Sequence, residues 1–133
     1  MSRRKVVVFF LALSLLPFPT TVVPEWQLRV TDKEGKPVAG VRARQFWKHY
    51  SLAWQGCCPE MEDRWTDANG YVVFPKRTIW AGVLRRIVFP VWAKAQTLAH
   101  GSTGIRAYVM ISDEYETNNY QPGKPLPNEV RPR

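Results

Sequence analysis

The stretch VTDKEGKPVAGVRAR, residues 30–44, decides the fold of this chain. Its centre predicts a turn, because Gly35 can take a positive φ and Pro37 fixes the backbone where the next strand begins. Apolar residues alternate with polar ones on both sides, and a period of two is typical of strands with one buried face. The predicted buried positions are Trp26, Leu28 and Val30 before the turn and Val41 and Ala43 after it.

A second turn lies in TDANGYVVFP, residues 66–75. Asp67 can accept backbone N–H groups as an Asx turn, and Gly70 supplies a left-handed position before the apolar strand that follows. Asp67 and Asn69 could instead begin a calcium loop. The Glu that such a loop requires near its twelfth position is Ile79 here, which favours the turn.

Together the two stretches resemble the carboxypeptidase regulatory-like domain, a transthyretin-like β-sandwich. The resemblance covers Trp26 to Phe74 and implies an exported sandwich that serves as an accessory, adhesive or stabilising module and carries no catalytic residue. We therefore expect a mainly β fold. Residues 24–116 should form a small Greek-key-like antiparallel β-sandwich, as a stand-alone module without a catalytic domain beside it. The motif residues are Gly35, Pro37, Val38, Gly40, Val41, Thr66, Asp67 and Gly70.

The N-terminal segment, residues 1–23, has the layout of a secretory signal. A cationic head, Met1 to Lys5, precedes an apolar run from Val6 to Leu16, which is short for a membrane span. We expect export to the periplasm or beyond, with an uncleaved N-terminal anchor as the main variant. A buried first strand is the alternative interpretation.

The chain is basic, with 19 Lys and Arg against 11 Asp and Glu. Removing residues 1–23 leaves 16 basic and 11 acidic residues, a net charge of +5. A modest excess spread over strands is typical of a solvated surface, so we expect no nucleic-acid partner. Membrane contact is expected only through the N-terminal segment.

The periodicity changes twice in the second half of the chain. Apolar residues recur at helical spacing from Thr78 to Leu98, which predicts a short amphipathic helical insert that Pro90 ends or kinks. Packing across the open end of the sandwich is favoured for this helix over a membrane surface. A clean alternation from Ile105 to Ile111 predicts another strand. Residues 117–133, which contain four prolines, predict a disordered tail.

An aromatic loop between the two motifs is the candidate interaction site. Flat rings beside polar groups suit contact with a protein or a glycan, although Trp47 and Trp65 could instead close the core. Cys57 and Cys58 are adjacent and could form a strained vicinal disulfide, stay reduced or bridge to a partner chain. The candidate loop residues are Trp47, Tyr50, Trp54 and Trp65.

Catalytic and cofactor motifs are absent from the sequence. It has no G-x-S-x-G elbow, no H-E-x-x-H helix and no phosphate-binding glycine loop, so no cofactor is expected. Hydroxyisourate hydrolases, a related sandwich family, require a terminal Tyr-Arg-Gly-Ser, and this chain ends differently. The acids Glu60, Glu62 and Asp63 favour a solvated loop over a glycosidase pair.

Two function classes remain. The first is a noncatalytic exported module that binds an envelope or extracellular protein or glycan. The second is a small exported metal or thiol protein, in which Cys57 and Cys58 act with His49 or His100. Adjacent thiolates seldom chelate one ion well, which favours the first class.

Overall fold

The computed structural model describes residues 2–53, 58–100, 104–112, 115 and 117–133. The chain is mainly β with two helices, which confirms the predicted fold class. The helices are α1 (Arg3–Leu15) and α2 (Val83–His100). The strands are β1 (Phe18–Val23), β2 (Trp26–Val30), β3 (Arg42–His49), β4 (Glu60–Trp65), β5 (Tyr71–Phe74), β6 (Arg77–Ala81), β7 (Ile105–Met110), β8 (Asn118–Tyr120) and β9 (Glu129–Val130).

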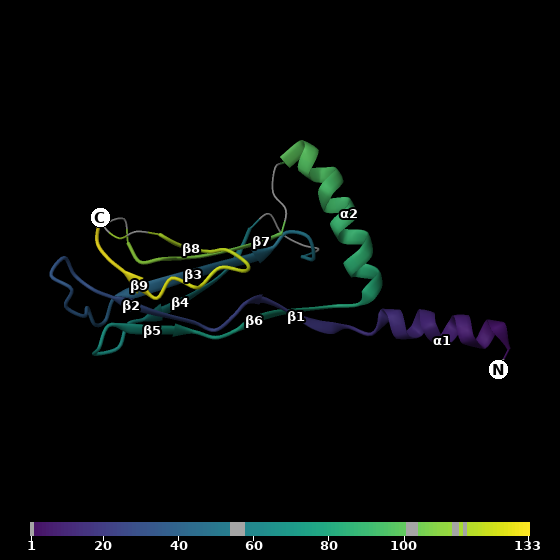
Figure 1. Ribbon diagram of the computed structural model, residues 1–133, viewed down its shortest axis with the longest axis horizontal. Coiled ribbons are helices and arrows are strands. Elements are labelled where there is room, and N and C mark those ends of the chain that lie inside the picture. Colours follow the sequence, from purple (N-terminus) through teal and green to yellow (C-terminus); the bar gives the residue numbers. More distant parts are fainter. Residues whose placement is uncertain (1, 54–57, 101–103, 113–114, 116) are drawn as a thin grey trace.

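The strands form two layers (Figure 1). One layer is a four-stranded antiparallel sheet in the order β4-β3-β7-β8. The other contains the sheet β5-β2-β9, in which β2 pairs antiparallel with β5 and parallel with β9. The antiparallel pair β1-β6 extends this second layer toward the two helices, because β1 leads into β2 and β5 leads into β6.

The core lies between the layers and follows the alternation of the sequence. Trp26, Leu28 and Val30 of β2 are fully buried, while Gln27 between them is exposed. The opposite layer contributes small and β-branched side chains, which leave room for the ring of Trp26. The core residues contributed by the other strands are Val22, Val23, Ala43, Val72, Phe74, Ala107, Val109 and Val130.

The two turn motifs lie side by side. Asp32 Oδ1 accepts the backbone N–H groups of Glu34 and Lys36, and Asp67 Oδ1 accepts those of Asn69 and Tyr71. Both are the Asx geometry that these sequences favour. The motifs are joined by the buried Thr66, whose hydroxyl accepts the Val41 N–H and donates to the Val38 carbonyl. Pro37 forms a bridge with Thr31, and Gly40 N–H donates to the Thr66 carbonyl.

Gly70 is the least replaceable turn residue. Its φ is +76°, and an added Cβ would lie 2.6 Å from the Val30 carbonyl oxygen and 3.0 Å from Pro37 Cβ. Gly35 has a φ of +81°, but a Cβ there would meet nothing within 4 Å. We expect Gly35→Ala to lower the free energy of unfolding by about 1 kcal/mol through backbone strain alone. Gly70→Ala should cost about 1 to 3 kcal/mol more, because the clash is with backbone.

Urea denaturation of the two alanine variants, followed by tryptophan fluorescence, checks this difference. Gly35→Ala serves as the matched control, since it carries the same strain without the clash. Equal midpoints for the two variants would show that the close approach at Gly70 has no energetic weight.

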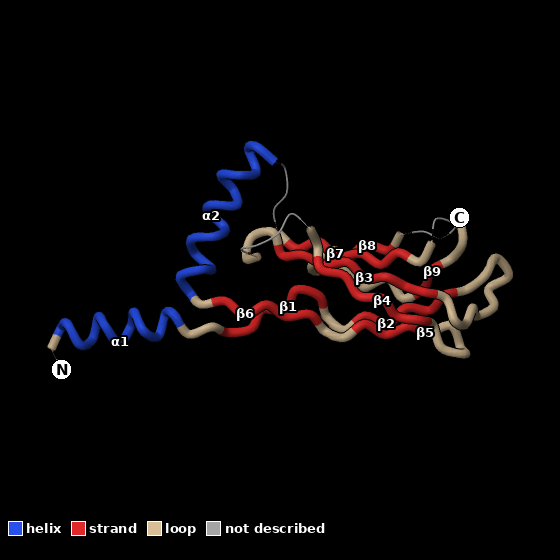
Figure 2. Tube along the Cα trace, turned by 180° about the vertical axis from the view of Figure 1, so that it is seen from behind, coloured by secondary structure: helices blue, strands red, loops and turns tan. Residues whose placement is uncertain are grey.

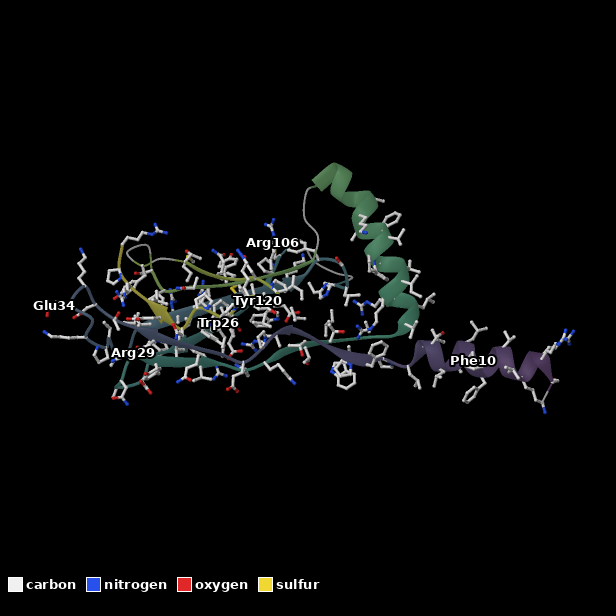
Figure 3. The ribbon with its side chains drawn as sticks, viewed as in Figure 1. Phe10, Trp26, Arg29, Glu34, Arg106 and Tyr120 are labelled. Atoms are coloured by element: carbon white, nitrogen blue, oxygen red, sulfur yellow. The ribbon has the colours of Figure 1, made fainter. Side chains whose placement is uncertain are left out.

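The C-terminal segment is ordered, so the predicted disordered tail at 117–133 is wrong where the structure describes it. β8 adds to β7, and β9 pairs with β2. Trp26 Nε1 donates to the Pro127 carbonyl at 2.7 Å, and the Tyr120 ring lies 6.4 Å from that of Trp26 (Figure 3). Val130 is buried in the core. The prolines do not prevent this, because the segment needs only short extended stretches to supply these contacts.

The folded domain begins before residue 24, which corrects the predicted boundary. β1 pairs with β6 from Phe18 to Val23, and both Val22 and Val23 are core residues. The predicted N-terminal segment therefore ends in strand β1, whose last two residues are buried. The apolar run before it forms α1, whose apolar side chains from Val7 to Leu16 are mostly exposed.

The predicted helical insert at Thr78 to Leu98 is confirmed as a helix, but its first residues are not helical. Its start is strand β6, in which Arg77, Ile79 and Ala81 face inward and Thr78 and Trp80 are exposed. Helix α2 begins only at Val83 and continues through Pro90 to His100. It rises from the end of β6 beside the end of the sandwich (Figure 2). Six of its described apolar side chains, Val83, Leu84, Ile87, Val88, Val91 and Trp92, are exposed, so they do not close the sandwich as expected.

Candidate interaction face

The outer face of the four-stranded sheet carries polar and aromatic side chains that the core does not use. The cross-strand register places Phe46 opposite Met61 of β4 and Tyr108 of β7, all on this face. We define the outer face by ten residues. They are Arg42, Arg44, Phe46 and Lys48 of β3, Met61, Asp63 and Trp65 of β4, and Arg106, Tyr108 and Met110 of β7.

Aromatic and thioether groups form the middle of the outer face. The rings of Phe46 and Tyr108 are stacked, with centroids 4.7 Å apart and planes 19° apart. Met61 beside them is 60% exposed, and Trp65 at the end of β4 is 62% exposed. Exposed Met and Trp side chains next to a stacked pair form an apolar surface that a partner can cover.

Positive charge surrounds this apolar centre. Arg44 donates two hydrogen bonds to the Asp63 carboxylate, at 2.5 and 2.7 Å. This pairing raises the pKa of Arg44 and lowers the pKa of Asp63. Asp63 is the one acid of the outer face, all of whose residues the structure describes. Arg42 is exposed and lies 3.9 Å from the same carboxylate. The face therefore carries an excess of cations over carboxylates.

Two further cations flank an aromatic ring at the far end of β3. The Tyr50 ring lies 5.0 Å from Lys48 Nζ and 5.9 Å from the guanidinium carbon of Arg106. Arg106 points away from the sandwich (Figure 3). Tyr50 itself is half-buried, and its backbone N–H donates to the Gly104 carbonyl. The predicted candidate Tyr50 thus supports two cations at the edge of the outer face.

The three predicted loop aromatics that the structure describes, Trp47, Tyr50 and Trp65, do not form one site. Trp65 is exposed on the outer face and does not close the core. Trp47 faces inward and packs against the core, with the Arg77 guanidinium 4.0 Å from its ring. Trp54 lies outside the described residues. Trp47 and Trp65 lie on opposite faces of the sheet because of how β3 pairs with β4. The sequence alone does not give this pairing.

A polar bridge that the sequence does not predict joins the two layers. Arg77 of β6 donates to Gln45 Oε1 at 2.9 Å and lies 2.6 Å from Glu62 Oε2. Gln45 is fully buried, and Arg77 is largely so. Hydrogen bonds from Arg64 and Arg77 lower the pKa of Glu62. This bridge ties β6 to the inner side of β3 and β4 and so positions the strands that carry the outer face.

The predicted thiol and metal residues are only partly described. Cys57 lies outside the described residues, and the side chain of His100 is not described. His49 and the exposed Cys58 line one cavity of about 80 Å³, together with Glu60. Burial lowers the pKa of His49. Among the described residues, no group of three or more His, Cys, Asp or Glu side chains could hold a metal ion.

Comparison with known proteins identifies no family. No family model matches the chain, and no curated protein matches it. Among solved structures it is similar to 3-chlorocatechol 1,2-dioxygenase from Rhodococcus opacus 1CP, with a TM-score of 0.38 and 14% identity. That match covers 80% of this chain and 56% of the dioxygenase chain. A similarity of this size carries no argument about function.

Proposed function

We propose that this protein is a noncatalytic exported β-sandwich module that binds an envelope or extracellular protein or glycan through its outer face. The observation that carries the proposal is the stacked pair Phe46 and Tyr108, with exposed Met61 and Trp65 beside it and cations around it. The resemblance to the carboxypeptidase regulatory-like domain agrees with a binding role. The apolar run from Val6 to Leu16 supports export.

The composition of the outer face suits a partner that presents apolar groups and carboxylates. Trp, Tyr, Phe, Met and Arg are enriched in the buried centres of protein interfaces, and Arg in particular binds carboxylates with two parallel hydrogen bonds. The ion pair of Arg44 with Asp63 shows that this geometry is accessible on the sheet. Arg42 and Arg106 are exposed on either side. We expect an acidic partner surface to meet these two side chains.

Substitution of the exposed apolar side chains tests the proposal. Met61→Ser with Trp65→Ser removes the two most exposed of them while leaving the core intact. Partner recovered from an envelope extract by the immobilised protein should fall by about tenfold or more, because buried interface anchors each contribute on the order of 1 to 2 kcal/mol. Quantitative mass spectrometry of the eluates measures the loss.

The matched control lies on the other layer. Tyr71 and Val73 of β5 are exposed on its outer side, so Tyr71→Ser with Val73→Ser makes a similar apolar loss away from the proposed surface. This control should recover partner as the unaltered protein does. Equal losses for both variants, or no loss for either, would contradict the assignment of binding to the outer face.

A further inference from the structure

The two helices carry a continuous apolar surface that the sandwich does not cover. On α1 the exposed side chains include Phe10, which points into solvent (Figure 3). On α2 the exposed apolar residues lie on one side of the helix, at three- and four-residue spacing. Those of α1 and its C-terminal cap are Val7, Val8, Phe9, Phe10, Leu11, Leu13, Leu15 and Leu16, and those of α2 are Val83, Leu84, Ile87, Val88, Val91 and Trp92.

α2 is oriented by Arg86, which faces the protein. Arg86 donates to the carbonyls of Phe18 and Ala81, at 2.7 and 3.0 Å, and to the Thr20 hydroxyl. Its guanidinium carbon lies 3.7 Å from the centre of the Phe18 ring. Arg86 thus holds its side of the helix against β1 and β6. The apolar side of α2 faces outward. A helix that packs on the core of its own domain would instead turn its apolar side inward.

The helices meet at one apolar hollow. A cavity of about 520 Å³ lies between the end of α1 and the start of α2 and is lined by Leu15, Leu84, Val88 and Phe89 among others. The helices approach closely here, since a Cβ on Gly82 would lie 3.0 Å from the Ser14 carbonyl oxygen. The lining of this cavity is mainly apolar and includes Ser14 and Arg85, so the apolar surfaces of the two helices meet at their junction beside one cation.

Charge identifies what covers this surface. The sequences of α1 and α2 contain no acid and six cations. Arg86 is bound to β1 and β6, and the other five are Arg3, Arg4, Lys5, Arg85 and Lys94. A second copy of the chain would bring like charges together, whereas an anionic bilayer offers acyl chains for the apolar groups and headgroups for the cations. Exposed Trp80 and Trp92 at the same end are residues that favour the membrane interface.

We propose that α1 and α2 together seat the protein on an anionic lipid bilayer, with both helices at the boundary between headgroups and acyl chains. Within the described residues, neither helix combines the length and apolar content needed to cross a membrane. α1 has 13 residues and is about 20 Å long, against about 30 Å for a hydrocarbon core. The proposal goes beyond the binding function, since it concerns a different surface, and it adds α2 to the membrane contact expected of the N-terminal segment.

Vesicle flotation of the full chain tests the proposal. The protein is purified in mild detergent, which is then removed in the presence of vesicles of phosphatidylcholine alone or mixed with phosphatidylglycerol. We expect flotation with the mixed vesicles and at least about tenfold less with the neutral ones, because each cation near an anionic surface adds to binding. Added salt should weaken binding to the mixed vesicles, because it screens these charges.

Val91→Ser with Trp92→Ser is the decisive variant. Both side chains are exposed, at 67% and 62%, so the change leaves the folded sandwich intact, which circular dichroism verifies. Partition into the anionic vesicles should fall about tenfold or more. Met61→Ser with Trp65→Ser removes side chains of similar exposure from the outer face and should float as the unaltered chain does.

Three results would overturn the proposal. The first is that the protein floats with neither kind of vesicle. The second is that the Val91→Ser, Trp92→Ser variant floats as well as the unaltered chain. The third is that the protein binds no lipid but forms a dimer, which this variant dissociates. The third result would assign the surface to a second copy. Because the outer-face variant is assayed separately for partner capture, failure of one proposal does not imply failure of the other.

Discussion

A chain that ends at Lys124 is expected to lose its cooperative unfolding transition at room temperature. The cut removes β9, the buried Val130 and the Pro127 carbonyl that accepts from Trp26 Nε1. Loss of these contacts exposes one side of Trp26 and leaves its indole N–H without that acceptor. The combined cost is on the order of 5 kcal/mol, which equals the entire stability of many small domains.

Thermal and urea unfolding of the shortened chain measure this loss. Val130→Ala in the full chain is an intermediate case and should cost about 1 to 3 kcal/mol, since it leaves a small cavity beside Val30. Gln121→Ala, at an exposed position of the same segment, should change the free energy of unfolding by less than about 0.5 kcal/mol. A shortened chain that melts within a few degrees of the full chain would show that the segment is not part of the fold.

Removal of β1 is the second change with a large expected effect. A chain that starts at Pro17 lacks α1 but keeps β1, whereas a chain that starts at Pro24 lacks both. The first should unfold as the full chain does. The second exposes the partners of Val22 and Val23 and leaves β6 unpaired, at a cost of about 3 to 6 kcal/mol.

Differential scanning calorimetry of the two shortened chains separates these expectations. Val23→Asp in the chain that starts at Pro17 should destabilise the domain as removal of β1 does. The substitution places a charge in the core that β1 helps to form. The result also bears on export. If the chain is processed by a signal peptidase, cleavage before Phe18 preserves the domain, and cleavage at Val23 does not. Equal stability of the two shortened chains would contradict this view of β1.

The turns and the main strands could be predicted because their signals are local. Asp32 and Asp67 each bond to backbone a few residues away, and the alternation of β2 and β7 needs only one buried face. β1 and β6 could not be predicted in the same way, because their pairing joins segments far apart in the chain. Ile79 also fits a helical period with the residues that follow it, so the sequence alone predicts a helix that begins within β6.

The candidate site depends on which residues of neighbouring strands lie opposite each other, and the sequence alone does not give this register. Phe46 and Tyr108 belong to different strands, and only the pairing of β3 with β7 stacks their rings. For the same reason Trp47 and Trp65, which look equivalent in the sequence, face opposite sides of the sheet. The burial of Val130 could not be predicted, because a single buried residue between prolines and charges produces no periodicity.

Position-specific cross-linking tests the central claim, that the outer face binds the partner, most directly. A photoreactive amino acid replaces either Met61 on the outer face or Val73 on the other layer, and both variants are irradiated in intact cells. Both positions are exposed, so they differ mainly in the face they report. We predict a discrete cross-linked product of higher mass from position 61 and none from position 73. Products from position 73 alone, or the same products from both positions, would contradict the claim.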